Sequence, residues 1–170
     1  MKQIRFSLLA AVIIILQLVL TKYCQATPFL HITLLPALVL CEPFSRPQSL
    51  VMTLAFATGL IVDALAEGVW GLNAVALVPV ALARPLIVGR TINEDIVRRG
   101  YAFSIRRNGL GKISVALILS TAIFCLLYSI LDGGGVRSFG FIAASFVLSA
   151  LASFIPGLFV VNVLCPEERN

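Results

Sequence analysis

Apolar segments of about membrane-spanning length recur along the whole chain and leave only short polar stretches between them. Hydrophobic residues make up 59% of the sequence and charged residues 12%, and the mean hydropathy of +1.02 exceeds that of soluble globular domains. Lipid offers no hydrogen bonds to a backbone, and apolar runs of about 17 to 25 residues suit single helices. The sequence therefore predicts an all-α, polytopic integral membrane protein.

Six segments approach the length of a transmembrane helix, and together they form one membrane domain over residues 1–170. The second is the weakest, because it is short and contains Pro28 and Pro36, each of which interrupts backbone hydrogen bonding. It is a candidate for a tilted, broken or partly re-entrant span. The predicted spans cover residues 4–20, 28–41, 50–65, 72–88, 113–131 and 139–164.

The amino-terminal segment admits two interpretations. Lys2 and Arg5, an apolar stretch and then Cys24-Gln25-Ala26 resemble a secretory signal with its cleavage site. The apolar run is long for a signal, and further spans follow it. We therefore expect the segment to be retained as the first helix.

The positions of Lys and Arg predict that both termini are cytoplasmic, since cytoplasmic loops near helix ends collect positive charge. With six spans and the amino terminus inside, only Lys22 and Arg137 of the 13 basic residues fall outside. If the second segment did not cross, the basic residues would be split between the two faces. The charge pattern therefore supports six spans.

The longest polar stretch, residues 90–112, lies in the cytoplasm in this topology. We expect it to anchor the topology and contact anionic lipid, or to dock a cytoplasmic partner. The basic residues assigned to these contacts are Arg90, Arg98, Arg99, Arg106, Arg107 and Lys112. Although the net charge is +5, the basic residues lie between apolar runs, so no nucleic-acid partner is expected.

The chain contains no recognisable catalytic set. His31 is its only histidine, no serine or cysteine occupies a nucleophile elbow, and the four cysteines include no CxxC pair. We expect His31 to be a packing or interfacial residue and the cysteines to act as small apolar residues. The sequence thus predicts no enzyme activity, no cofactor and no metal site.

The end of the third predicted span places small and acidic residues on one face. Ala55, Gly59, Asp63 and Glu67 recur every four residues, and small residues there would let a neighbouring helix approach closely. Glu67 falls in the external turn, whereas Asp63 lies inside the span, where an unpaired charge facing lipid is costly.

Asp63 needs a partner in this arrangement. Arg84 lies more than about 10 Å deeper in the membrane at 1.5 Å per residue, so direct pairing is not expected. The side chain of Asn73 and the backbone N–H groups that open the fourth span are the expected partners. Asp63→Asn is then expected to be mild, although a proton, ion or ligand role for Asp63 stays open.

The connection between the third and fourth spans predicts a tight external turn. Gly68 and Gly71 allow the bend, and Trp70 suits the headgroup level. At the other end of the fourth span, Arg84 precedes Pro85, and its guanidinium is expected to snorkel or to face a partner.

The segment GLIVDALAEGVWGLNAVALVPVALARP, residues 59–85, resembles the central part of the rod shape-determining protein MreD family. That family shows a Gly-Leu-x-x-Asp helix end, a glycine-containing turn and a Gly-Leu-Asn-Ala opening of the next helix. The Arg-Pro pair followed by a basic stretch is similar to the Bacteroidetes-like branch. The residues that carry the resemblance are Gly59, Asp63, Gly71, Asn73, Arg84 and Pro85.

The resemblance implies a non-enzymatic inner-membrane component of the machinery that elongates the cell wall. Its implied partners are MreC, the actin-like MreB, the glycosyltransferase RodA and the penicillin-binding transpeptidase paired with RodA. The alternative is a substrate-binding membrane subunit of an energy-coupling-factor transporter, which is also small and six-helical. A transporter should enclose a cavity around Asp63, Glu67 and Asn73, whereas a scaffold should pack that region.

Overall fold

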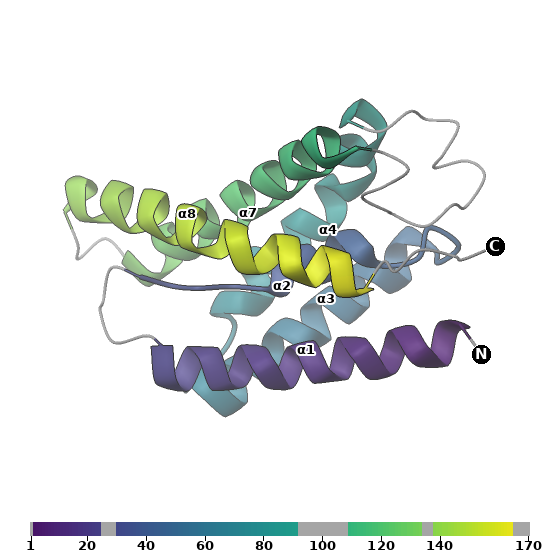
Figure 1. Ribbon diagram of the computed structural model, residues 1–170. Helices are drawn as coiled ribbons and strands as arrows, with labels where there is room; N and C mark the ends of the chain where they lie inside the picture. Colours follow the sequence, from purple (N-terminus) through teal and green to yellow (C-terminus); the bar gives the residue numbers. More distant parts are fainter. Residues whose placement is uncertain (1, 25–29, 92–108, 134–137, 165–170) are drawn as a thin grey trace.

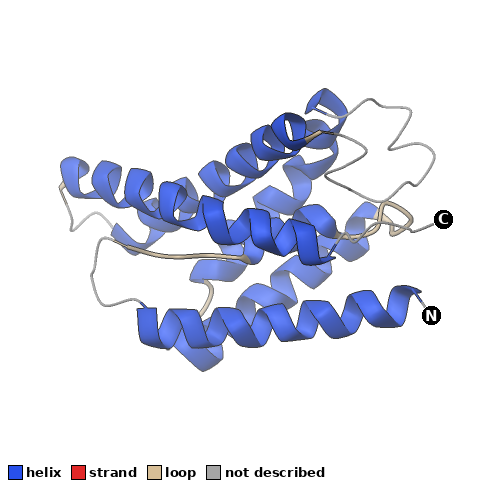
Figure 2. Cartoon of the chain, in the orientation of Figure 1, coloured by secondary structure: helices blue, strands red, loops and turns tan. Residues whose placement is uncertain are grey.

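The computed structural model describes residues 2–24, 30–91, 109–133 and 138–164, and every regular element in these ranges is helical (Figures 1 and 2). The predicted all-α class is therefore confirmed for this part of the chain. The elements are α1 (Lys2–Cys24), α2 (Leu35–Cys41), α3 (Gln48–Val62), η1 (Asp63–Glu67), α4 (Leu72–Thr91), α7 (Leu110–Gly133) and α8 (Phe139–Leu164).

Five helical segments are long and apolar enough to cross a membrane: α1, α3 with η1, α4, α7 and α8. They match the first, third, fourth, fifth and sixth predicted spans, and α8 has the predicted limits of 139–164. The others extend past the predicted spans by a few residues. A multi-pass membrane protein is thus the class that these helices support.

The second predicted span, residues 28–41, is described from residue 30 onward, and residues 30–41 do not form one continuous helix. Residues 30–33 form a stretched connection (Figure 1), Leu34 at the N-cap already has helical backbone angles, and α2 contains only 7 residues. Pro36 explains the late start, because a proline is accommodated in the first turn of a helix, where its missing N–H is not needed. The chain is therefore broken where the sequence predicted a weak span.

The extended part gives this short segment an unusual reach. Four extended residues at about 3.3 Å and eight helical ones at about 1.5 Å span roughly 25 Å, against roughly 18 Å for a helix of the same length. The segment runs between α1 and α8 in the direction opposite to α1 (Figure 1). Residues 30–41 are thus long enough to cross most of a hydrocarbon core of about 30 Å.

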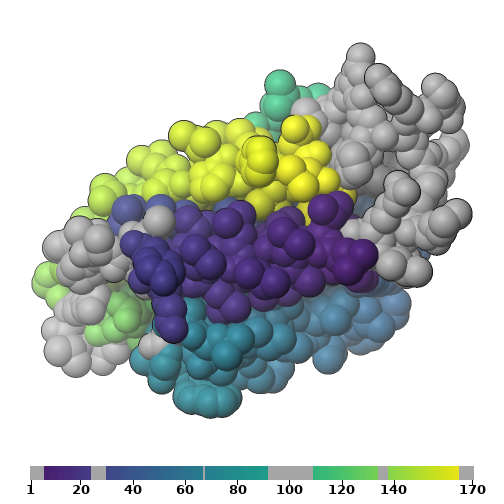
Figure 3. All heavy atoms as spheres, turned by 60° about the horizontal axis from the view of Figure 1, so that its bottom comes forward, coloured from purple at the N-terminus to yellow at the C-terminus, as the bar shows by residue number. Residues whose placement is uncertain are grey.

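The second segment also forms the centre of the bundle. Every residue of α2 is buried, and α2 contacts α4, α7 and α8. α1 is the most peripheral element and lies on the surface between α8 and the α3–α4 hairpin (Figure 3). Large apolar side chains on the outer faces are exposed, among them Leu8, Val12, Leu151, Ile155 and Phe159. This pattern suits a protein whose outer surface meets lipid.

Candidate functional site

The α3–α4 hairpin holds two backbones in direct contact at Gly59. A Cβ built on Gly59 would lie 2.4 Å from the Ala74 Cα atom and 2.5 Å from the Ala74 nitrogen. Ala55, one turn earlier, is buried on the same face. The predicted close approach of a neighbouring helix to this face is therefore confirmed, and only glycine fits at position 59.

Asp63 lies one turn beyond Gly59, and 0% of its surface is exposed. Its Oδ1 atom accepts the backbone N–H and the side-chain Nδ2–H of Asn73, both at 2.9 Å. Its Oδ2 atom accepts the N–H groups of Gly71 at 2.9 Å and of Ala74 at 3.3 Å. The predicted contacts with Asn73 and the start of the fourth helix are thus present, and four donors surround the carboxylate.

The connection between the helices aims these donors at the carboxylate. The N–H of Gly68 donates to the Asp63 carbonyl at 2.9 Å, which makes the last turn of α3 a wide π turn, η1. Gly68 and Gly71 have φ values of 71° and 98°, a conformation that favours glycine. The chain reverses within these residues, as predicted, and Trp70 is exposed between them. The side chain of Glu67 lies outside the described structure.

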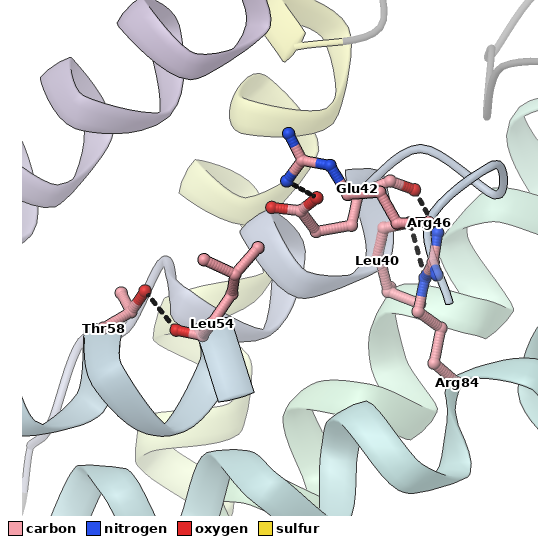
Figure 4. A network of polar contacts seen from close by, with 6 residues as sticks. All are labelled: Leu40, Glu42, Arg46, Leu54, Thr58 and Arg84. Atoms are coloured by element: carbon pink, nitrogen blue, oxygen red, sulfur yellow. Dashed lines mark hydrogen bonds and ion pairs between the residues drawn. The ribbon is translucent and has the colours of Figure 1, made fainter. Parts of the chain in front are cut away.

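Arg84 lies near the other end of α4 and turns into the bundle, with only 3% of its surface exposed. Its Nε–H donates to the Leu40 carbonyl at 3.4 Å, and Nη2 donates to the Glu42 carbonyl (Figure 4). Its guanidinium carbon also lies 4.3 Å from the centroid of the Phe44 ring. The prediction of a snorkelling or partner-facing cation was therefore wrong.

The position of Arg84 has a clear physical reason. The last carbonyls of a helix lack intrahelical donors and carry partial negative charge, so a cation placed there is stabilising. Arg84 thus holds the end of the short helix α2, and none of the four donors around Asp63 comes from it, as the depth estimate predicted.

Glu42 and Arg46 complete this end of the bundle. Glu42 is buried, and its Oε2 atom lies 2.6 Å from Nη1 of Arg46 (Figure 4). Burial raises the pKa of Glu42, while the charges of Arg46 and Arg84 oppose the rise. Arg46 also lies over the Phe6 ring, with 5.8 Å between its guanidinium carbon and the centroid. The cluster joins α1, α2 and α4, and the sequence did not reveal it.

Pro85 leaves one carbonyl of α4 without its helical donor, because the N–H that would bond the Ala81 oxygen is missing. Gln48 at the start of α3 supplies the donor, with Nε2 at 2.5 Å from the Ala81 oxygen. A side chain from a neighbouring helix therefore replaces the lost backbone bond, as a helix in lipid requires.

This arrangement predicts that Gln48 and Pro85 are energetically coupled. Gln48→Leu alone should destabilise the protein by about 1–2 kcal/mol, because the Ala81 oxygen loses its partner. With Pro85→Ala present, position 85 gains an N–H, and Gln48→Leu should cost much less. Unfolding of the two single variants and the double variant in detergent measures the coupling. Equal costs of Gln48→Leu in both backgrounds would contradict this explanation.

The extended residues of the second segment are hydrogen bonded by side chains on both sides. On the α1 side, Gln17 donates from Nε2 to the Ile32 carbonyl at 3.1 Å and accepts the Leu34 N–H at 2.7 Å. On the α8 side, the hydroxyls of Ser149 and Ser153 accept the N–H groups of His31 and Thr33, both at 2.9 Å. Non-helical backbone is tolerated at membrane depth only when it is satisfied in this way.

The sequence contains polar positions that correspond to these contacts. Gln17 interrupts an otherwise apolar run from Leu8 to Leu20. Ser149 and Ser153 recur at a four-residue spacing in another apolar run, and their hydroxyls accept hydrogen bonds from the second segment. Gln17 thus bonds the backbone of residues 32 and 34 from α1.

His31 occupies a buried site and stacks on Tyr128, with 4.0 Å between ring centroids. It is therefore a packing residue, as predicted. Cys41 and Cys125 are buried free thiols, which agrees with their interpretation as small apolar residues. Within the described ranges, no three His, Cys, Asp or Glu side chains gather where they could hold a metal ion.

The structure describes the basic stretch over residues 90–112 only at its two ends. Arg90 and Lys112 are exposed near the facing ends of α4 and α7. Arg98, Arg99, Arg106 and Arg107 lie outside the described residues, so their predicted contacts stay predictions.

No protein-family model, curated protein or solved structure matches this chain. The local geometry therefore carries the functional interpretation. Of the six residues that carry the family resemblance, four meet at one end of the hairpin: Gly59, Asp63, Gly71 and Asn73. Arg84 and Pro85 lie toward the other end of α4 and take part in separate contacts with α2 and α3.

Proposed function

We propose that this protein is a non-enzymatic scaffold of the cell-wall elongation machinery in the inner membrane of a rod-shaped bacterium. The first support is the resemblance of residues 59–85 to the MreD family. The residues that carry this resemblance have identifiable structural tasks in the hairpin and at the end of α2. Such tasks give a physical reason for this pattern in a protein that acts by packing.

The observation that carries the proposal is the burial and the hydrogen bonding of Asp63. Its carboxylate is fully buried and accepts four hydrogen bonds from its own hairpin. Asn73 is also fully buried and donates to it. A packed hairpin end is what a scaffold requires, whereas a transporter needs these groups to reach a ligand.

We further propose six crossings with both termini in the cytoplasm. α1 begins and α8 ends at the same end of the bundle (Figure 1). Residues 30–41 run in the direction opposite to α1. They can therefore serve as the second crossing, which makes six crossings with the five long helices. Of the 13 basic residues, only Lys22 and Arg137 fall outside in this topology.

In this role the protein would couple a cytoplasmic filament to wall synthesis outside the cell. Exposed helix faces would contact the spans of MreC, RodA and the transpeptidase paired with RodA. The basic stretch over residues 90–112 would contact MreB or anionic lipid at the cytoplasmic face. No catalytic group is needed for such a function.

One observation favours the second candidate, a substrate-binding subunit of an energy-coupling-factor transporter. Discontinuous spans often form binding sites in transporters, and residues 30–41 are discontinuous. However, the N–H groups of His31, Thr33 and Leu34 are already bonded to side chains of α1 and α8. This bonding favours a structural role for the break.

Depletion of the protein from its rod-shaped host tests the proposal. We expect round cells and normal uptake of small nutrients, because the machinery that elongates the wall would lose a component. Purification of the tagged protein from membranes should recover wall-synthesis proteins. Normal rods with a specific uptake defect, or recovery of a transporter ATPase in their place, would overturn the proposal in favour of the second candidate.

A further inference from the structure

Three aromatic side chains protrude from one end of the bundle. Tyr23, Trp70 and Phe139 are 81%, 74% and 89% exposed. They come from three separate places in the chain: the end of α1, the turn between η1 and α4, and the start of α8. The alternating directions of the helices bring these places to the same end (Figure 1). We call these residues the aromatic collar.

The opposite end of the same helices carries exposed positive charge. Arg90 near the end of α4 and Lys112 near the start of α7 are both exposed. From Leu72, beside the collar, to Arg90 the helical rise is about 27 Å, and from Lys112 to Asp132 it is about 30 Å. These values match the thickness of a bilayer hydrocarbon core, about 30 Å.

The surface between the two levels is suited to lipid tails. The exposed side chains along α4 and α7 are aliphatic, among them Leu82 and Leu86 on α4 and Val115, Ile118 and Leu126 on α7. Among the described residues of α4 and α7, the next exposed charge is that of Asp132, near the end of α7. Lys22, also exposed, directly precedes Tyr23 of the collar. Charge costs little at that level, because headgroups and water are within reach.

We propose that the aromatic collar binds the headgroup–acyl boundary of one leaflet and that Arg90 and Lys112 bind anionic headgroups of the other. The phenol of Tyr23 and the indole of Trp70 combine an apolar body with a polar edge, which suits this boundary, and the ring of Phe139 contributes apolar area alone. The two levels together determine the depth of the bundle in the membrane. This inference is independent of the proposed function, because it holds for a scaffold and for a transporter.

Trp70 provides a direct test, because it is the only tryptophan in the chain. The full-length protein is reconstituted in phosphatidylcholine–phosphatidylglycerol vesicles that contain lipids brominated either near the headgroup or near the chain end. We expect stronger quenching of Trp70 fluorescence by the bromines near the headgroup. Stronger quenching by the chain-end bromines, or no quenching with the emission of a fully hydrated indole, would overturn the proposal.

Two reporter variants in a Trp70→Phe background serve as controls. Phe139→Trp moves the reporter to another member of the collar, and it should repeat the shallow quenching pattern. Leu148→Trp places the reporter at an exposed position on the same helix, about 14 Å from Phe139 along its axis. It should be quenched more strongly by the chain-end bromines. The same depth for both variants would contradict the assignment of the collar.

Discussion

Gly59→Ala is expected to open the α3–α4 hairpin and to lower the stability of the protein by about 3 kcal/mol or more. The added methyl group would lie 2.4 Å from the Ala74 Cα atom, and backbone cannot move aside as a flexible side chain can. Separation of the helices would also lengthen the hydrogen bonds from Asn73 and Ala74 to Asp63. Thermal unfolding in detergent and the amount of protein in the membrane measure the effect.

Gly89→Ala is the matched control for this variant. Gly89 also lies in a helix of the hairpin, but a Cβ there would meet nothing within 4 Å. Alanine should therefore be neutral or should stabilise α4 by up to about 1 kcal/mol, because it restricts the unfolded chain. If the two variants had the same unfolding temperature, steric contact at Gly59 could not explain the choice of glycine.

Asp63→Asn should destabilise the hairpin strongly, by roughly 2–5 kcal/mol, since two buried donors would lose their acceptor. The sequence alone predicted a mild effect, on the ground that an amide still accepts hydrogen bonds. The structure changes this expectation, because each carboxylate oxygen accepts two bonds. An asparagine keeps one acceptor oxygen, and its NH₂ group would face two N–H donors.

Asn73→Ala is the variant with which the loss of stability in Asp63→Asn is compared. It removes one of the four donors and leaves both carboxylate oxygens with backbone partners. It also removes the Asn73 Oδ1 atom, which is buried without a hydrogen-bond partner among the described residues. The loss in unfolding temperature should therefore be clearly smaller than for Asp63→Asn. The opposite order would contradict the four-donor description of Asp63.

The same two variants separate structure from function at this site. If Asp63 acts only by holding the hairpin, the fraction of rod-shaped cells should fall in proportion to the loss of folded protein from the membrane. If Asp63→Asn abolished function while its unfolding temperature and membrane level matched the parent, the charge itself would be required. A proton, ion or ligand role would then replace the structural one.

Local patterns predicted the hairpin well, because its determinants lie close together in sequence. The four-residue spacing of Ala55, Gly59 and Asp63 places them on one helix face. Asn73 follows after one short connection, at the start of the next helix. A buried carboxylate needs donors, and the nearest donors are the first N–H groups of the next helix. The contacts of Asp63 therefore followed from the sequence, whereas their number did not.

Long-range contacts were not predictable in the same way. Arg84 bonds the carbonyls of Leu40 and Glu42, more than 40 positions away, and Gln48 bonds Ala81. Each of these side chains meets its partner only once the helices have packed. An arginine near a helix end has the same local pattern whether it snorkels to the surface or turns inward.

The sequence by itself determined the helical, multi-pass membrane class, the five helices long and apolar enough to cross a bilayer and the tie across the α3–α4 hairpin. Apolar runs, charge placement and helical spacing are local properties, and lipid leaves the backbone few alternatives. Only the tertiary structure decided how the second segment is built, because its extended residues depend on Gln17 from α1 and on Ser149 and Ser153 from α8. A broken segment is stable in the bilayer only when distant side chains complete its hydrogen bonds.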